Sequence, residues 1–116
     1  MAKKAIVNYD VDQDILWVHS GDKIKDSLDL DRFVIDFSAD DKIVGVEISG
    51  ASKFLSEIIG SNISKLVLRG VKDASISFYQ GKQILSVFLY LRIAGETERI
   101  PISSFPKRMA IPAKRK

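Results

Sequence analysis

Apolar and polar residues alternate along most of the first half of the chain. Four segments show this period of two: KAIVNY (4–9), ILWVH (15–19), RFVIDF (32–37) and KIVGVEI (42–48). Successive side chains of a β-strand point to opposite faces, so the alternation predicts four strands. The segments between them are rich in Ser, Gly and Asp, which favour tight turns. The first half of the chain is therefore predicted to be an antiparallel meander of about four strands.

The period changes to that of a helix at about residues 50–59. Five apolar residues recur there at helical spacing, on one face: Ala51, Phe54, Leu55, Ile58 and Ile59. Ser49 is the expected N-cap, and Gly60 is the expected residue of positive φ at the C-terminal end. We expect this amphipathic helix to lie across the meander. Residues 62–70 match a helix and a strand about equally well.

Alternation returns after residue 73 and predicts about three further antiparallel strands. They are ASISFYQ (74–80), QILSVFLYLRI (83–93) and TERIPIS (97–103). Pro101 assigns the last of them to an edge of the sheet. The predicted fold class is α+β, with a single domain over residues 1–106. Residues 107–116 are expected to form a basic, disordered tail.

The strand at 83–93 is apolar on both faces, whereas a half-exposed antiparallel strand is polar on one. We expect the helix to cover the face that carries Leu85, Val87, Leu89, Leu91 and Ile93. The other face carries Ile84, Phe88 and Tyr90, and an exposed apolar patch of this kind is typical of an interface. These three residues are therefore predicted to form the contact of a homodimer. The alternative is that the N-terminal meander folds over them within one chain.

The net charge of +3 is unevenly distributed along the chain. Residues 1–50 contain eleven acidic and six basic residues, whereas five basic residues lie in the last ten: Lys107, Arg108, Lys114, Arg115 and Lys116. This tail is expected to be solvated, with nucleic-acid binding through it as the alternative. The chain contains no cysteine and no apolar run as long as a membrane-spanning helix. We therefore expect a cytoplasmic protein that does not contact a membrane.

Several short motifs occur in an order that is known from one protein family. They are Tyr9 and Asp10, then Asp14 with Leu16 and Trp17, then the strand from Val34 to Phe37, and then DDKIVGVEISGASK from Asp40 to Lys53. Over roughly residues 1–55 the chain thus resembles the small proteins of domain of unknown function family 2283. Trp17 stands where Tyr is common in that family, and Asp41 stands where Gly is often found. Because the family has no established chemistry, the resemblance implies a fold rather than an activity.

Asp10, Asp12 and Asp14 are the candidate metal ligands of the chain. A calcium loop that starts at Asp10 would need glycine at its sixth position and glutamate at its twelfth, but Ile15 and Gly21 occupy these positions. Asp10 and Asp14 are therefore predicted to bracket a β-turn and to accept hydrogen bonds from its backbone N–H groups. A small metal-binding or hydrolytic domain built on this cluster is the alternative.

The rest of the sequence contains no specific catalytic motif. His19 is the sole histidine, and Glu47 is expected to be solvated. The sequence therefore predicts no enzyme, no catalytic residue and no cofactor. The favoured function is that of a non-enzymatic interaction module, which acts as a homo-oligomer or as the small, antitoxin-like partner of another protein.

Overall fold

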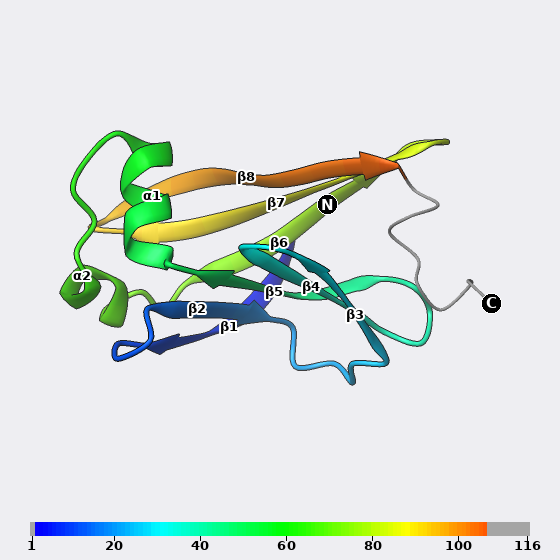
Figure 1. Cartoon of the computed structure of the whole chain (residues 1–116), viewed down its shortest axis with the longest axis horizontal. Helices are drawn as coiled ribbons and strands as arrows, with labels where there is room; N and C mark the ends of the chain where they lie inside the picture. The colour runs from blue at the N-terminus through cyan, green and yellow to red at the C-terminus, as the bar shows by residue number, and fades with distance from the viewer. Residues whose placement is uncertain (1, 107–116) are drawn as a thin grey trace.

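The computed structural model describes residues 2–106 as one curled sheet of eight antiparallel strands with two short helices (Figure 1). The elements are β1 (Ala2–Asp10), β2 (Ile15–His19), β3 (Asp26–Leu30), β4 (Phe33–Phe37), β5 (Ile43–Ser49), α1 (Ala51–Ile59), α2 (Lys65–Arg69), β6 (Ala74–Gln80), β7 (Ile84–Ile93) and β8 (Glu96–Pro106). The tail predicted at 107–116 lies outside the described residues. The predicted combination of antiparallel strands and helix is confirmed, but its arrangement differs from the prediction.

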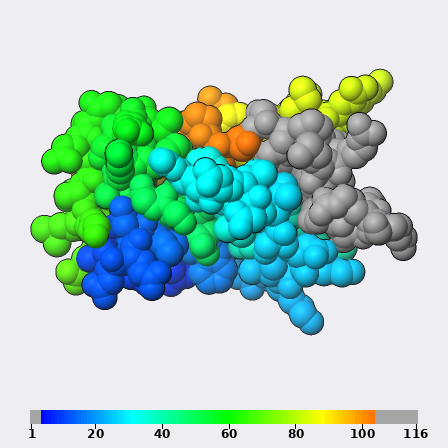
Figure 2. Space-filling model, viewed as in Figure 1, coloured from blue at the N-terminus to red at the C-terminus, as the bar shows by residue number. Residues whose placement is uncertain are grey.

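Strand β1 joins two halves of the sheet. The strand order is β3-β4-β5-β2-β1-β6-β7-β8. Residues 6–10 of β1 pair with β2, whereas residues 2–5 pair with β6. Each half is thus attached to a different part of the same strand, and the sheet curls so that the inner faces of the two halves meet. Figure 2 shows the N-terminal half, in blue to cyan, spread across one face of the molecule, with α1 and α2, in green, at one end.

A single apolar core fills the space between the two halves. Its fully buried side chains come from both of them: Leu16 and Val18 of β2, Ile35 of β4, Val46 and Ile48 of β5, Val87, Leu89 and Leu91 of β7, and Ile100 of β8. The inner face of β7 is therefore buried as predicted, but α1 is too short to cover all of it. Nine residues of helix span only about 14 Å, against about 33 Å for the ten residues of β7. The N-terminal strands supply the remaining cover.

The N-terminal strands do not follow a simple meander. β2 pairs with β1 and β5, so β5 lies inside the sheet and β4 and β3 lie beyond it. β5 is the most thoroughly buried of these strands, which explains its central position. Strand β3 was not predicted, because its segment DSLDL contains only two apolar residues, Leu28 and Leu30. An edge strand tolerates such polarity, since half of its backbone groups face solvent.

The signals at the helix ends are partly confirmed. Gly60 ends α1 with a φ of 83°, as predicted, but the prediction of Ser49 as N-cap was wrong. Gly50 occupies that position with a φ of 63°, and no side chain next to it caps the helix. The ambiguous segment 62–70 contains α2, whose N-cap Ser64 accepts a backbone hydrogen bond at 3.1 Å. Neither helix in the described part of the chain is long and apolar enough to cross a membrane.

Candidate functional site

The three aspartates of the turn between β1 and β2 have different partners. One oxygen of Asp10 accepts the backbone N–H of Gln13 at 3.1 Å, as a turn residue would. Asp12 is exposed. Asp14 accepts hydrogen bonds from residues of β1 and α1 rather than from the turn itself. Within residues 2–106, no three His, Cys, Asp or Glu side chains are grouped so that they could hold a metal ion.

Asp14 connects the first hairpin to helix α1. Its carboxylate accepts the Tyr9 hydroxyl at 2.5 Å. The carboxylate also accepts the backbone N–H of Ser52 at 3.0 Å and the Ser52 hydroxyl at 2.7 Å. The main-chain oxygen of Asp14 accepts the N–H of Ala51 at 3.0 Å. Asp14 therefore caps α1 from a distant turn, which explains why glycine is sufficient at position 50.

The surroundings of Asp14 favour its charged form. Burial alone would raise its pKa, but hydrogen bonds from Tyr9 and Ser52, with the charge of Lys65, outweigh burial and hold the pKa of Asp14 below its ordinary value. Burial and the hydrogen bond to Asp14 raise the pKa of Tyr9 above the ordinary value of tyrosine. The pair therefore consists of a carboxylate and a neutral phenol at neutral pH.

The lowered pKa of Asp14 predicts a loss of stability in acid. A carboxyl group with a lower pKa in the folded than in the unfolded chain stabilises the fold above its unfolded pKa of about 3.9. The free energy of unfolding should fall as the pH decreases from about 4 through the lower folded pKa. Urea unfolding over this range measures the effect. Asp14→Asn should lose less stability in acid than the wild type, and an equally steep loss would assign it to other carboxylates.

A second hydrogen-bonded group lies on the outer face of the N-terminal half. Asp36 of β4 is only 6% exposed. It accepts the indole N–H of Trp17 at 3.1 Å and the hydroxyl of Ser27 at 2.7 Å. Gly45 of β5 lies between these groups, and a Cβ atom there would stand 2.5 Å from a carboxylate oxygen of Asp36. Sequence reasoning missed this buried carboxylate, although a glycine inside a strand signals a close approach of this kind.

Trp17 stands beside an open hollow on the same outer face. Its ring stacks on that of His19, with centroids 3.8 Å apart, and His19 Nε2 donates to Asn8 Oδ1 at 2.7 Å. The hollow has a volume of about 460 Å³, and six residues line it: Asn8, Tyr9, Asp10, Ile15, Trp17 and Glu47. Its two charged lining groups, Asp10 and Glu47, are both acidic.

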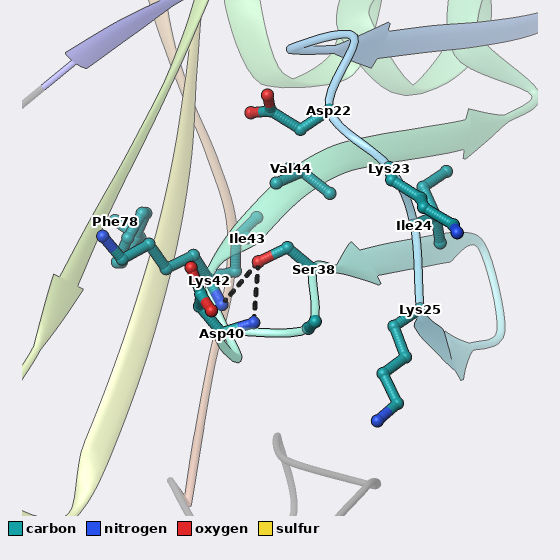
Figure 3. Close-up of a pocket in the computed structure, with 11 residues that line it drawn as sticks. Asp22, Lys23, Ile24, Lys25, Ser38, Asp40, Lys42, Ile43, Val44 and Phe78 are labelled. Atoms are coloured by element: carbon teal, nitrogen blue, oxygen red, sulfur yellow. Dashed lines mark hydrogen bonds between the residues drawn. The ribbon is translucent and has the colours of Figure 1, made fainter.

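A larger pocket of about 770 Å³ opens between the loops that flank β3 and β5 (Figure 3). Its floor is apolar and includes Val44 and Phe78. Lys23, Lys25 and Lys42 stand around it, but Figure 3 shows their ammonium groups diverging rather than meeting at one point. No single ligand group would contact all three of them, so the charge of this pocket does not indicate a specific ligand.

The predicted contact residues share the outer face of β6, β7 and β8. Tyr79 is 65% exposed and Ile84 is 53% exposed. The rings of Phe88 and Tyr90, which follow Ile84 along the same face of β7, are half-buried. The guanidinium of Arg99 lies 4.1 Å above the ring of Phe88. We call this surface the C-terminal face. The N-terminal strands pack against the opposite, inner face of β7, so they do not cover these side chains.

The basic residues predicted as nucleic-acid contacts, Lys107, Arg108, Lys114, Arg115 and Lys116, lie outside the described residues. Their role stays a prediction.

Comparison with known proteins gives matches to the N-terminal half. An uncharacterized protein of Methanocaldococcus jannaschii is 43% identical over 54 residues, which are 46% of this chain and 47% of that protein. The matched part thus spans about half of the relative's length. No solved structure matches the chain. Residues 6–52 match the family model described as "Protein of unknown function (DUF2283)", which confirms the predicted resemblance for the segment from β1 to the start of α1.

Proposed function

We propose that the protein is a non-enzymatic interaction module that forms a homodimer through its C-terminal face. The observation that carries this proposal is the exposure of Ile84 and Tyr79, next to the half-buried Phe88 and Tyr90, on one outward surface. Monomeric proteins seldom leave a contiguous patch of this kind uncovered. Alternatively, the same surface could bind a different protein, of which this chain would be the small, antitoxin-like partner.

The chemistry of the C-terminal face supports protein binding. Tyr, Phe and Arg are the side chains enriched in the buried centres of interfaces. Here the Arg99 guanidinium lies over Phe88, which presents a flat and partly apolar surface to a partner. The rest of the face carries small hydroxyl side chains such as Ser75 and Ser77, which permit close approach.

Two of the polar groups that could have served catalysis, His19 and Asp36, have structural partners. His19 binds Asn8 and stacks on Trp17, and Asp36 accepts two hydrogen bonds. Within residues 2–106, no buried side-chain nitrogen or oxygen lacks a hydrogen bond. These contacts favour a binding role over a catalytic one. The proposal places the module in the cytoplasm, which the absence of cysteine supports.

Light scattering at micromolar concentration tests the dimer. The wild type is expected to have twice the mass of the chain, and Ile84→Glu should be monomeric because it places a charge in the contact. We expect the dissociation constant to rise by at least about 100-fold, because the contact would bury a charge that has no partner. Leu66→Glu is the matched control, since Leu66 is 73% exposed on α2, away from this face. A wild type of monomeric mass would contradict the dimer, and dissociation by Leu66→Glu would assign the contact elsewhere.

A further inference from the structure

We infer that the hollow beside Trp17 is a binding site for an organic cation, such as the guanidinium or ammonium group of a basic peptide. The hollow lies on the outer face of β1, β2 and β5. This is the other half of the sheet from the C-terminal face, so the inference does not depend on the proposed dimer.

Trp17 lines the hollow, and its indole is held in place by two neighbours. Alternate residues of β2 share the outer face, so Ile15, Trp17 and His19 follow one another along it. His19 occupies one side of the indole at 3.8 Å. Ile15, on the other side, lines the hollow, whereas His19 does not. Because the indole N–H is also bound to Asp36, the ring is held in one orientation, and a cation in the hollow would contact the side of the ring that His19 does not cover.

Two carboxylates flank this aromatic face. Glu47 of β5 pairs directly with Trp17 in the sheet, and Asp10 lies on the other side, on β1. Glu47 is half-buried, yet it makes no hydrogen bond or ion pair with any other residue within 2–106. Asp10 uses one oxygen for the N–H of Gln13. The described lining contains no basic residue, so a bound cation would neutralise a half-buried carboxylate that has no partner in this part of the chain.

The lining selects the class of cation. Two carboxylates supply too few oxygen atoms for Ca²⁺, which takes about 6–8 oxygen ligands, and no three His, Cys, Asp or Glu side chains within residues 2–106 are grouped to hold a metal ion. The apolar side chains of Ile15 and Trp17 instead suit a cation that carries carbon, because they can contact its alkyl part. Trp gives the strongest cation–π contact of the aromatic residues, and Arg and alkylated ammonium groups are its usual partners.

Trp17 provides a direct measurement, because it is the only tryptophan in the chain. Its fluorescence and its single indole N–H signal in NMR both report on this hollow. Titration with N-acetyl-arginine amide or with tetramethylammonium chloride should give a saturable change at millimolar concentration. The neutral analogue tert-butanol should give none, and sodium chloride at equal ionic strength controls for salt.

Two variants separate the site from general surface charge. Glu47→Gln should weaken cation binding at least fivefold, whereas Glu57→Gln, the same exchange at an exposed position of α1, should leave it unchanged. A short arginine peptide that binds more tightly than the free amide would assign the site to a peptide, and equal binding would assign it to a free small cation. Titrations that do not saturate, an equal response to tert-butanol, or unchanged affinity in Glu47→Gln would overturn the inference.

Discussion

Replacing Asp14 by alanine is expected to lower the free energy of unfolding by about 3 kcal/mol. The carboxylate accepts three hydrogen bonds, one from Tyr9 and two from Ser52, and a bond to a charged group contributes about 1.5–3 kcal/mol. The three are not additive, because they share one acceptor group. The substitution also leaves the first turn of α1 without its cap, which adds to the loss. Urea unfolding at neutral pH measures the change.

Asp12→Ala is the matched control for this prediction, since Asp12 lies in the same turn but is exposed. It should change the free energy of unfolding by no more than about 0.5 kcal/mol. Tyr9→Phe, which removes one of the three donors to the charged carboxylate, should cost about 1.5 kcal/mol. Equal effects of Asp12→Ala and Asp14→Ala would show that the turn as a whole, rather than its connection to α1, determines stability. Added Ca²⁺ or Mg²⁺ should not restore the loss.

Gly45→Ala is expected to destabilise the fold by about 2–4 kcal/mol. The new Cβ would stand 2.5 Å from an oxygen of Asp36 and 3.2 Å from Trp17 Nε1, so the carboxylate must move. Moving it breaks the bonds to Trp17 and Ser27 while Asp36 stays in a site that is almost closed to water. Chemical unfolding followed by Trp17 fluorescence reports both the stability and the change in the indole environment.

Gly70→Ala serves as the control for backbone and volume effects. Its added Cβ would meet only a carbonyl oxygen at 3.5 Å, which is ordinary contact, and the φ of Gly70 is −87°. A double variant, Gly45→Ala with Asp36→Ala, tests the mechanism. If the collision with Asp36 is the cause, the double variant should be less destabilised than the sum of the two single changes. Additive losses would place the strain of Gly45→Ala elsewhere.

Much of the fold could be predicted because the local pattern and the tertiary environment agree. In β7 the residues that alternate inward, such as Leu89, are the ones buried between the two halves of the sheet. Gly60 ends α1 for a purely local reason, its positive φ. At these positions the local pattern is therefore sufficient to predict the conformation.

The remaining features could not be predicted because they depend on residues that are far apart in sequence. The cap of α1 comes from Asp14, 38 positions before Ser52, so the local signal pointed to Ser49 instead. The burial of Asp36 depends on three other strands, which supply Trp17, Ser27 and Gly45. Strand β3 forms because the edge of β4 is available to it rather than because its own residues favour a strand.

The shared strand β1 has a consequence for the order in which the chain can fold. Residues 6–10 can pair with β2 as soon as the first hairpin is complete, but residues 2–5 must wait for β6, which lies some seventy positions later in the chain. During synthesis the N-terminal half therefore carries an open backbone edge next to apolar side chains that have no cover yet. Closure of this long loop is entropically slow. Until residues 2–5 pair with β6, a partly synthesised chain is thus most prone to associate with other chains.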